Sequence, residues 1–220
     1  MSQLFKTARK NKVLNVLVDH KIRKNSSSEA KTIKIFLKTF NIQLNIISNT
    51  KKIEKNIQSS AREVRYDLLS DFCKKKSTKF ILTGHHSDDQ VETFLIRLSR
   101  GSGVQGLSSM DQISRLKDNI KLFRPLLDYK KKDLKYIAKS IFKKSFKDPS
   151  NKDNKYLRTR IRGLGKQLEI SGIHHDQIIQ SIKNLTISRN TLNNYLFKVT
   201  KNCVRRKINE ILIDFRILEK

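Results

Sequence analysis

The sequence predicts an α/β protein in which helices cover both faces of a parallel sheet, followed by a small all-α domain. Apolar runs of strand length alternate with segments whose apolar residues recur at helical spacing, which is typical of parallel sheets. A polar stretch at 147–153 interrupts this pattern, and no strand is evident after it. We therefore expect an α/β domain over 1–150 and a helical domain over 151–220.

Strands and helices alternate through the first half of the chain. The apolar runs that we interpret as strands are 13–19, 42–47 and 79–83. The segments with helical spacing are 26–40 and 57–75. Ser26 and Glu29 have the spacing of a capping box at the start of the first of these helices.

The second half continues the alternation and then becomes helical. A helix is expected from about Ser87 to Ser99, and a glycine-bearing loop, Gly101–Gly106, follows it. A short strand at 120–125 and a helix at 133–142 end the α/β pattern. The later segments that we interpret as helices are 156–170, 174–200 and 203–218.

The charge of the chain points to an anionic partner. Its 220 residues include 48 Lys and Arg against 20 Asp and Glu, a formal net charge of +28. A surface this basic attracts polyanions, so nucleic acid is the first partner class to consider. The alternative is that part of the charge reflects an AT-rich genome, since lysine greatly outnumbers arginine and Asn and Ile are frequent.

Cysteine usage and hydropathy indicate a protein of the reducing cytoplasm. Cys73 and Cys203 are the two cysteines, and their spacing supports neither a disulfide framework nor a cysteine-held metal. No uncharged apolar run approaches the length of a membrane span. We expect a soluble, cytoplasmic protein without a membrane partner.

Chemically reactive side chains follow two of the predicted strands. Ligands of parallel sheets bind outside the carboxyl ends of the strands, and there the first strand ends in Asp19-His20 while the third runs into Gly84–Thr93. This second stretch holds the candidate catalytic residues His85, His86, Asp88, Asp89 and Glu92.

Three carboxyl groups and two imidazoles are thus expected to converge beside a helix start. Asp88 and Asp89 are candidate ligands for Mg²⁺, which binds few protein carboxylates and many phosphate oxygens. A histidine there is suited to accept a proton near neutral pH. The alternative is that the two aspartates only complement the helix dipole and the histidines are ordinary turn residues.

The stretch 82–107, Leu-Thr-Gly-His-His-Ser-Asp-Asp-Gln-Val-Glu-Thr through Gly-Ser-Gly-Val-Gln-Gly-Leu, resembles the signature of the tRNA(Ile)-lysidine synthetases. Four further segments agree with that family in the same order. They are Val18–Arg23, Ala61–Tyr66, Arg124–Leu127, and Asp148–Asn151 followed by Tyr156, Arg158 and Arg162.

The resemblance implies a Rossmann-like fold of the ATP-pyrophosphatase (PP-loop) type and a tRNA-modifying ligase that uses ATP and Mg²⁺. Members adenylate the wobble cytidine of the CAU anticodon of tRNA(Ile) at C2 and release pyrophosphate. Free L-lysine then displaces AMP to form lysidine. The positions that the resemblance assigns to ATP are Asp19, His20, Arg62 and Gly84. A thiolating relative of the same fold is disfavoured because its usual cysteine pairs are absent.

One family element is missing from the sequence. Members begin with a strand and a Ser-Gly-Gly-x-Asp-Ser loop that wraps the ATP phosphates, and the 220 residues contain no such loop. The chain opens instead with a helical fragment marked by Leu4, Phe5 and Ala8. We expect the strand and loop to be encoded upstream of Met1, or the gene to have decayed. Since this strand lies mid-sheet, its neighbours should keep unpaired edges. A catalytically inactive RNA-binding remnant is the alternative function.

Basic side chains are the candidates for tRNA binding. The resemblance covers Arg158 and Arg162 but not Arg160, so those two rank first, and they are joined by Arg97, Arg100, Lys130, Lys131 and Lys132. Such residues provide the electrostatic footprint for an anticodon stem. The alternatives are a solvated face for the lysines and a helix C-terminal role for Arg97 and Arg100.

Overall fold

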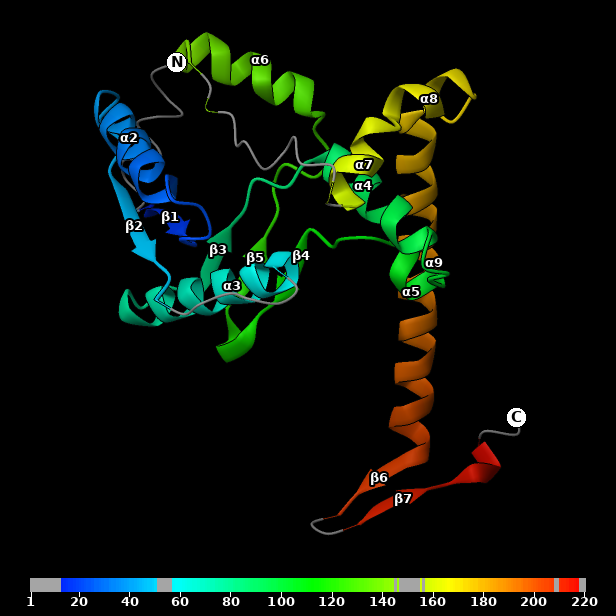
Figure 1. Ribbon diagram of the computed structural model, residues 1–220. Coiled ribbons are helices and arrows are strands. Elements are labelled where there is room, and N and C mark those ends of the chain that lie inside the picture. Colours follow the sequence, from blue (N-terminus) through cyan, green and yellow to red (C-terminus); the bar gives the residue numbers. More distant parts are fainter. Residues whose placement is uncertain are drawn as a thin grey trace. The chain divides into compact units, whose positions relative to one another are not determined.

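The computed structural model describes residues 13–50, 57–144, 146, 155, 157–207 and 210–217 (Figure 1). The chain forms two compact units, one of Met1–Thr83 with Ile113–Phe123 and one of Gly84–Gln112 with Arg124–Lys220. The expected opening helical fragment and the predicted domain boundary near residue 150 both lie outside the described residues.

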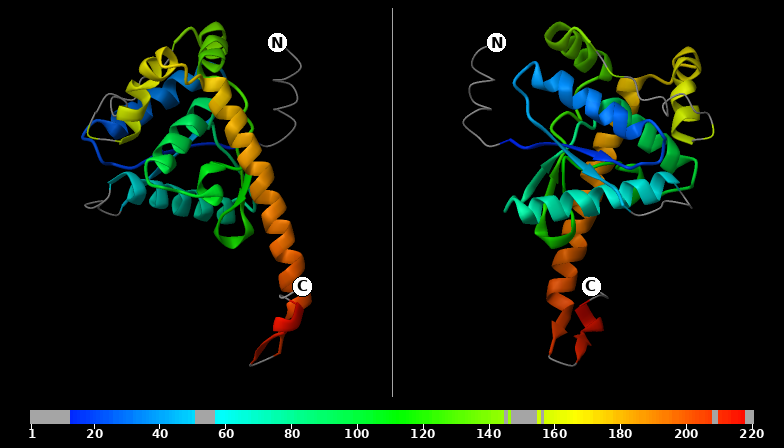
Figure 2. Two further views of the ribbon diagram at one scale, coloured as in Figure 1. Left: turned by 90° about the vertical axis from the view of Figure 1, so that its right-hand side faces the viewer. Right: turned by 60° about the vertical axis from the view of Figure 1, so that its left-hand side comes forward.

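The first unit contains the parallel strands that the sequence predicts. β1 (Asn15–Asp19) pairs in parallel with β2 (Leu44–Ser48), with Leu17 opposite Ile46. α2 (Ser26–Lys38) connects these strands, and α3 (Ile57–Lys75) follows β2. The two helices lie on opposite faces of the strand pair (Figure 2), which confirms the expected coverage of both faces.

A second sheet in this unit is of mixed direction. β3 (Phe80–Leu82) pairs in parallel with β5 (Lys121–Phe123). β4 (Ile113–Arg115), which the sequence analysis did not predict, is antiparallel to β5, and the short 3-10 helix η1 (Lys117–Asn119) joins the two. A two-strand hairpin fits there because its connecting residues Asp118 and Asn119 accept positive φ angles.

The two sheets are separate pairings that share a covering helix. Among the described residues, β1 pairs only with β2, and β3 pairs only with β5. Each of these open sheets has two outer edges within the described residues, and the missing mid-sheet strand stays a prediction. α3 contacts both β1 and β3 and so packs against both sheets.

The core of the first unit lies between α3 and the β3–β5 pair. Cys73 of α3 packs with Ile81, Ile120 and Leu122, and each is at most 7% exposed. Since side chains alternate along a strand, Phe80 and Leu82 point to the opposite face, where they are 60% and 66% exposed.

The expected capping box at the start of α2 does not form. Asn25 is the N-cap residue, and the Ser26 hydroxyl donates to Asp19 Oδ1 at 2.7 Å, whereas in a capping box it would accept a backbone N–H of the helix. Glu29 binds Arg23 through two hydrogen bonds of 3.2 and 3.0 Å. Asp19 and Arg23 therefore bind the two side chains, Ser26 and Glu29, that would have formed the capping box.

The second unit is mainly helical. Its elements are α4 (Ser87–Leu98), α5 (Val104–Leu107), α6 (Lys131–Phe142), α7 (Leu157–Gly163), α8 (Gly165–Ile170) and α9 (His175–Cys203). The helix predicted at 156–170 is divided at Leu164, which is flanked by Gly163 and Gly165, two residues that weaken helices.

The prediction of a helix over 203–218, and with it of a purely helical end, is wrong. β6 (Val204–Arg206) and β7 (Ile211–Ile213) form an antiparallel hairpin, followed by the 3-10 helix η3 (Phe215–Ile217). β-branched Val204, Ile211 and Ile213 favour strands.

Within the described part of the chain, every helix is too short or too polar to cross a membrane.

Candidate functional site

The end of β1 holds a buried carboxylate. Asp19 is 3% exposed, and it accepts hydrogen bonds from the hydroxyls of Ser26 and Ser27 and from the N–H of Lys21. Burial by itself raises the pKa of Asp19, but the two serines and Lys21 outweigh it, so the pKa lies below its ordinary value. Asp19 is therefore held as an anion at the rim of the sheet.

His20 lies beside an arginine that the sequence analysis did not assign to the site. Arg65 Nε lies 3.3 Å from His20 Nε2, while the buried His20 Nδ1 has no partner among the described residues. Burial, and then the charge of Arg65, lower the pKa of His20. Arg65 lies inside Ala61–Tyr66, a segment that resembles the lysidine synthetases, and this resemblance could have identified it as a site residue.

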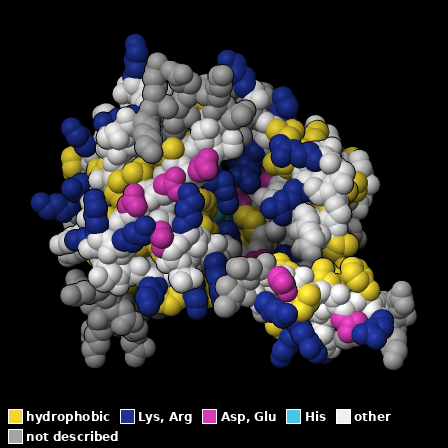
Figure 3. Space-filling model, turned by 90° about the horizontal axis from the view of Figure 1, so that it is seen from below, with side chains coloured by type: hydrophobic (Ala, Val, Ile, Leu, Met, Phe, Trp, Pro, Cys, Tyr) yellow, Lys and Arg dark blue, Asp and Glu magenta, His cyan; other side chains and the backbone are white. Residues whose placement is uncertain are grey.

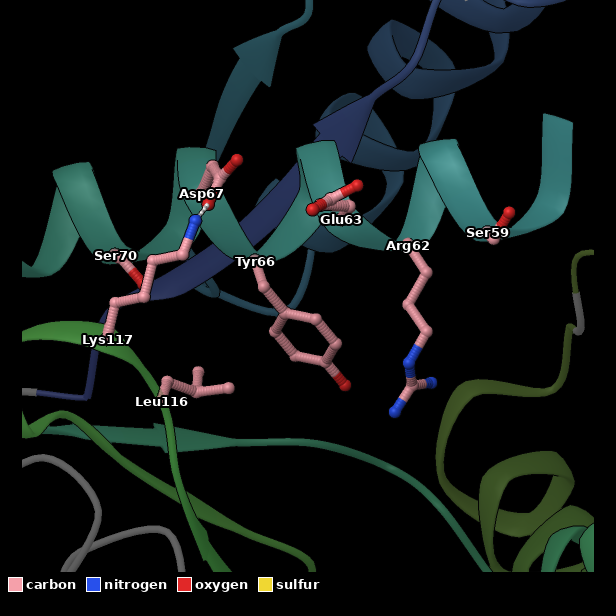
Figure 4. Close-up of a pocket in the computed structure, with 8 residues that line it drawn as sticks. All are labelled: Ser59, Arg62, Glu63, Tyr66, Asp67, Ser70, Leu116 and Lys117. Carbon is pink, nitrogen blue, oxygen red and sulfur yellow. Dashed lines mark hydrogen bonds and ion pairs between the residues drawn. The ribbon is translucent and has the colours of Figure 1, made fainter. Parts of the chain in front are cut away.

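Arg62, predicted to bind ATP, lines an open pocket of about 360 Å³ along α3. Figure 4 shows Arg62 and Tyr66 pointing away from α3 on the side of the helix where Leu116 lies, with the Arg62 guanidinium 5.1 Å from the Tyr66 ring centre. Asp67 and Lys117 form an ion pair of 3.1 Å across the pocket. Neither Asp19 nor His20 lines this pocket.

In the second unit, the two predicted metal ligands organise the start of α4. Asp89 accepts the N–H of His86 at 3.0 Å, and Asp88 accepts the N–H of Lys131 at 2.8 Å. His86 Nδ1 lies 3.4 Å from Asp89 and 3.7 Å from Asp88. The exposed Gly84 and the half-buried His85 immediately precede them. Three of the five candidate catalytic groups thus gather here.

Glu92, a predicted catalytic residue, forms an ion cluster with the two arginines that rank first for tRNA binding. Its side chain is 6% exposed, and both of its oxygens bind Arg162, at 2.6 and 2.9 Å. Arg158 Nε lies 3.3 Å away and its Nη2 donates to Thr93. Glu92 raises the pKa of Arg162. Residues that the sequence analysis placed in separate roles therefore share one site.

The other predicted RNA-binding residues have varied surroundings. Arg97 donates to the carbonyls of Gly106 and Ser109 at 2.7 and 2.9 Å, so it braces the glycine loop. Lys130 pairs with Asp176 at 2.7 Å, which raises the lysine pKa. Arg100 and Lys132 are exposed, and Lys131 is half-buried. Lysine and arginine side chains are spread widely over the face seen in Figure 3.

A buried arginine that the sequence did not single out fixes the loop after α5. Arg189 of α9 binds Asp111 and donates to the Ser108 hydroxyl at 2.9 Å. Gln90 of α4 holds the backbone of Met110 through its amide, at 2.8 and 2.9 Å. In the sequence, the feature that could have marked Arg189 as a buried, paired residue is its position as a charged residue on the apolar face of a helix.

The described residues offer two carboxylates, rather than a complete ligand set, for a metal. No group of three or more His, Cys, Asp or Glu side chains gathers as a metal site in the part of the chain that the structure describes. Asp88 and Asp89 each use one oxygen in the backbone bonds given above. A pair of carboxylates fits Mg²⁺, which commonly takes one or two of them together with substrate phosphates.

Family comparison agrees with the fold and with these motifs. Residues 1–168 match the family model of the PP-loop domain, and the chain belongs to this family of ATP-binding proteins. The resemblance to lysidine synthetases is confirmed as well. The chain is 39% identical over 202 residues to the tRNA(Ile)-lysidine synthase of Wolbachia pipientis wMel, covering 90% of this chain and 47% of that protein.

Other relatives agree. The tRNA(Ile)-lysidine synthase of Orientia tsutsugamushi strain Boryong is 34% identical over 205 residues, which cover 93% of this chain and 46% of that protein. The chain spans about half the length of the curated relatives it matches. Among solved structures, the U34-tRNA thiolase NcsA from Methanococcus maripaludis, with its 4Fe–4S cluster, has a similar fold. Its TM-score is 0.64 at 16% identity, over 83% of this chain and 65% of NcsA.

Proposed function

We propose that this chain provides the adenylating part of a tRNA(Ile)-lysidine synthetase. The observation that carries the proposal is the 31–39% identity to proteins of that name over most of this chain. The chain has a formal net charge of +28. A protein this basic binds the phosphates of nucleic acids, which supports RNA as the substrate. Such a reaction would take place in the cytoplasm, where tRNA and ATP are present.

The proposed reaction has two steps. The C2 oxygen of the wobble cytidine in the CAU anticodon attacks the α-phosphorus of ATP, an O–P bond forms, and pyrophosphate leaves. The amine of free L-lysine then attacks C2, the C–O bond breaks, and AMP leaves with that oxygen. The amine loses its proton to a base, and the product is lysidine.

The described residues suggest a division of tasks. Asp88 and Asp89 would hold Mg²⁺, which would offset charge on the leaving pyrophosphate. Asp19, His20, Arg62 and Gly84 would contact ATP. His85, His86 or an aspartate of α4 would take the proton of the lysine amine.

The Glu92 cluster would connect catalysis to RNA binding. The side chains of Arg158 and Arg162 remain 39% and 31% exposed although both pair with Glu92, so both would be accessible to an RNA phosphate. Arg97, Arg100, Lys130, Lys131 and Lys132 would extend this footprint. We assign nucleotide chemistry to residues 1–150, which also contain those five cations, and the remaining tRNA contacts to residues 151–220.

A second candidate function is RNA binding without catalysis. The observation that favours it is the absence of a Ser-Gly-Gly-x-Asp-Ser sequence from the 220 residues. Backbone N–H groups of such a loop would bind the ATP phosphates, so this chain alone is expected to bind tRNA without turning over ATP.

The test compares this chain with a chimera that carries the N-terminal segment of the Wolbachia relative in front of Met1. Both are incubated with ATP, lysine and a CAU-anticodon tRNA(Ile) transcript, and AMP and lysine-labelled tRNA are measured. We expect lysine-dependent product from the chimera alone. A chimera that folds and binds tRNA but never incorporates lysine would contradict the proposed ligase function. Turnover by the 220-residue chain would overturn our account of the loop.

A further inference from the structure

An exposed aromatic side chain lies in the turn that leads into α6. Tyr129 is 55% exposed, and it lies between β5 and α6, directly before Lys130, Lys131 and Lys132. None of the tasks proposed above uses this tyrosine. A single exposed aromatic residue needs no explanation by itself, so its meaning depends on what holds the turn in place.

The turn is bound to the start of α4 by two hydrogen bonds. The N–H of Ser87 donates to the carbonyl of Tyr129 at 3.0 Å. The N–H of Lys131 donates to Asp88 Oδ2 at 2.8 Å. Tyr129 therefore lies beside the helix turn that carries the proposed Mg²⁺ ligands.

The same turn is also anchored from within its own segment. The N–H of Tyr129 donates to the carbonyl of Leu126 at 3.0 Å, and Leu127 is 6% exposed. Lys130 is paired with Asp176 of α9 at 2.7 Å. Because the backbone that carries the tyrosine is already ordered, a ligand that binds its ring costs little further backbone entropy.

The proposed reaction needs an aromatic group beside this helix turn. The C2 oxygen of the wobble cytidine has to reach the α-phosphorus of ATP, so the base must leave the stack of the anticodon loop. Proteins hold unstacked RNA bases against the faces of aromatic side chains. Cations next to such a ring bind the neighbouring phosphates, and Lys131 and Lys132 follow Tyr129 closely in the chain.

We propose that Tyr129 stacks on the base of the wobble cytidine and holds it beside the first turn of α4. The inference rests on the proposed function and deepens it, because it assigns the residue that holds the base to be modified. Stacking uses the face of the ring and not the hydroxyl. A phenylalanine at this position is therefore expected to serve equally well.

Tryptophan fluorescence tests the contact directly, because the chain contains no tryptophan. In Tyr129→Trp, a short RNA hairpin with a CAU anticodon loop should cause a saturable loss of fluorescence as the base covers the indole. A hairpin with an abasic wobble nucleotide keeps its phosphates and should leave the fluorescence unchanged, as should ATP alone. Tyr136→Trp in α6, where the tyrosine is 75% exposed, is the matched control and should not respond.

Hairpin affinities give a second measurement, read from the fluorescence anisotropy of labelled RNA. Tyr129→Ala should weaken binding of the CAU hairpin about tenfold, whereas Tyr129→Phe should bind as the original chain does. The salt dependence should stay the same, because no phosphate contact is lost. The original chain and Tyr129→Ala should bind the abasic hairpin equally, since the partner of the ring is then absent.

The outcomes separate this inference from the proposed function. A hairpin that binds the original chain but leaves the fluorescence of Tyr129→Trp unchanged overturns the stacking contact, while RNA binding stands. An equal loss of fluorescence with the abasic hairpin or with ATP alone overturns it as well. A hairpin that does not bind the original chain overturns the RNA substrate of the proposed function together with the contact.

Discussion

Glu92 and Arg162 form a two-point ion pair, with Oε1 to Nε at 2.6 Å and Oε2 to Nη2 at 2.9 Å, across 70 residues of sequence. This pair connects α4 to α7. A carboxylate that is 6% exposed is costly to desolvate without such partners. The candidate catalytic helix is thus held in place by the residues proposed to bind tRNA.

Glu92→Gln should lower the free energy of unfolding by about 1–3 kcal/mol, because two partly exposed arginines lose a charged acceptor. Urea denaturation followed by circular dichroism measures this. Glu63→Gln, which changes an exposed carboxylate on α3, serves as the control and should stay within about 0.5 kcal/mol. Equal stability of Glu92→Gln and the original chain would show that the ion pair is not structural.

His20 should make the protein less stable in mild acid. Burial and Arg65 hold the pKa of His20 below its ordinary value of 6.5, so the unfolded chain binds more protons than the folded one as the pH falls through and below that value. Stability is then complete above pH 6.5 and declines as the folded-state pKa is approached. His20→Gln should reduce this decline, measured from urea midpoints at about pH 7.5 and 5.5. An unchanged pH slope would contradict the assignment.

Gly106→Ala should be destabilising by about 1–3 kcal/mol. A Cβ at this position would lie 2.6 Å from the Cβ of Ser102, so the glycine loop must shift. Gly103→Ala is the matched control, since its Cβ meets nothing within 4 Å. Thermal unfolding of both variants tests the difference. A Gly106 variant as stable as the Gly103 variant would show that the loop yields easily.

Asp89→Asn should abolish product formation in the chimera described above while tRNA affinity changes only a few-fold. The amide keeps an acceptor for the His86 N–H but loses the charge proposed to hold Mg²⁺. Single-turnover assays and filter binding separate the two effects. Loss of tRNA binding together with activity would place Asp89 in the RNA interface.

Arg158→Ala should weaken tRNA binding and reduce the dependence of affinity on salt. Its side chain is 39% exposed beside Glu92, and Glu92 keeps its two bonds to Arg162 in this variant, so the fold is expected to be retained. Binding is measured at several salt concentrations. Arg205→Ala, an exposed arginine in β6, provides a charge-matched comparison. Equal losses at both positions would indicate unspecific attraction.

From β1 to α4, the order of strands and helices was determined by the sequence because each of these elements depends on local periodicity. The runs ending at Asp19 and before Gly84, and the amphipathic segment of α4, carry their own signals, and so the rim residues could be named in advance. Asp88, Asp89 and His86 come together for the same reason, since all lie within one turn.

Only the tertiary structure decided which distant residues meet. Glu92 is separated from Arg158 and Arg162 by more than sixty residues, and no local pattern states that a buried carboxylate will choose these cations. The same holds for Ser26 and Ser27, whose hydroxyls bind Asp19. It also holds for the β6–β7 hairpin, where pairing between the strands overrides the apparent helical spacing of the sequence. Such choices depend on desolvation and on competition between partners, which arise only when the chain is packed.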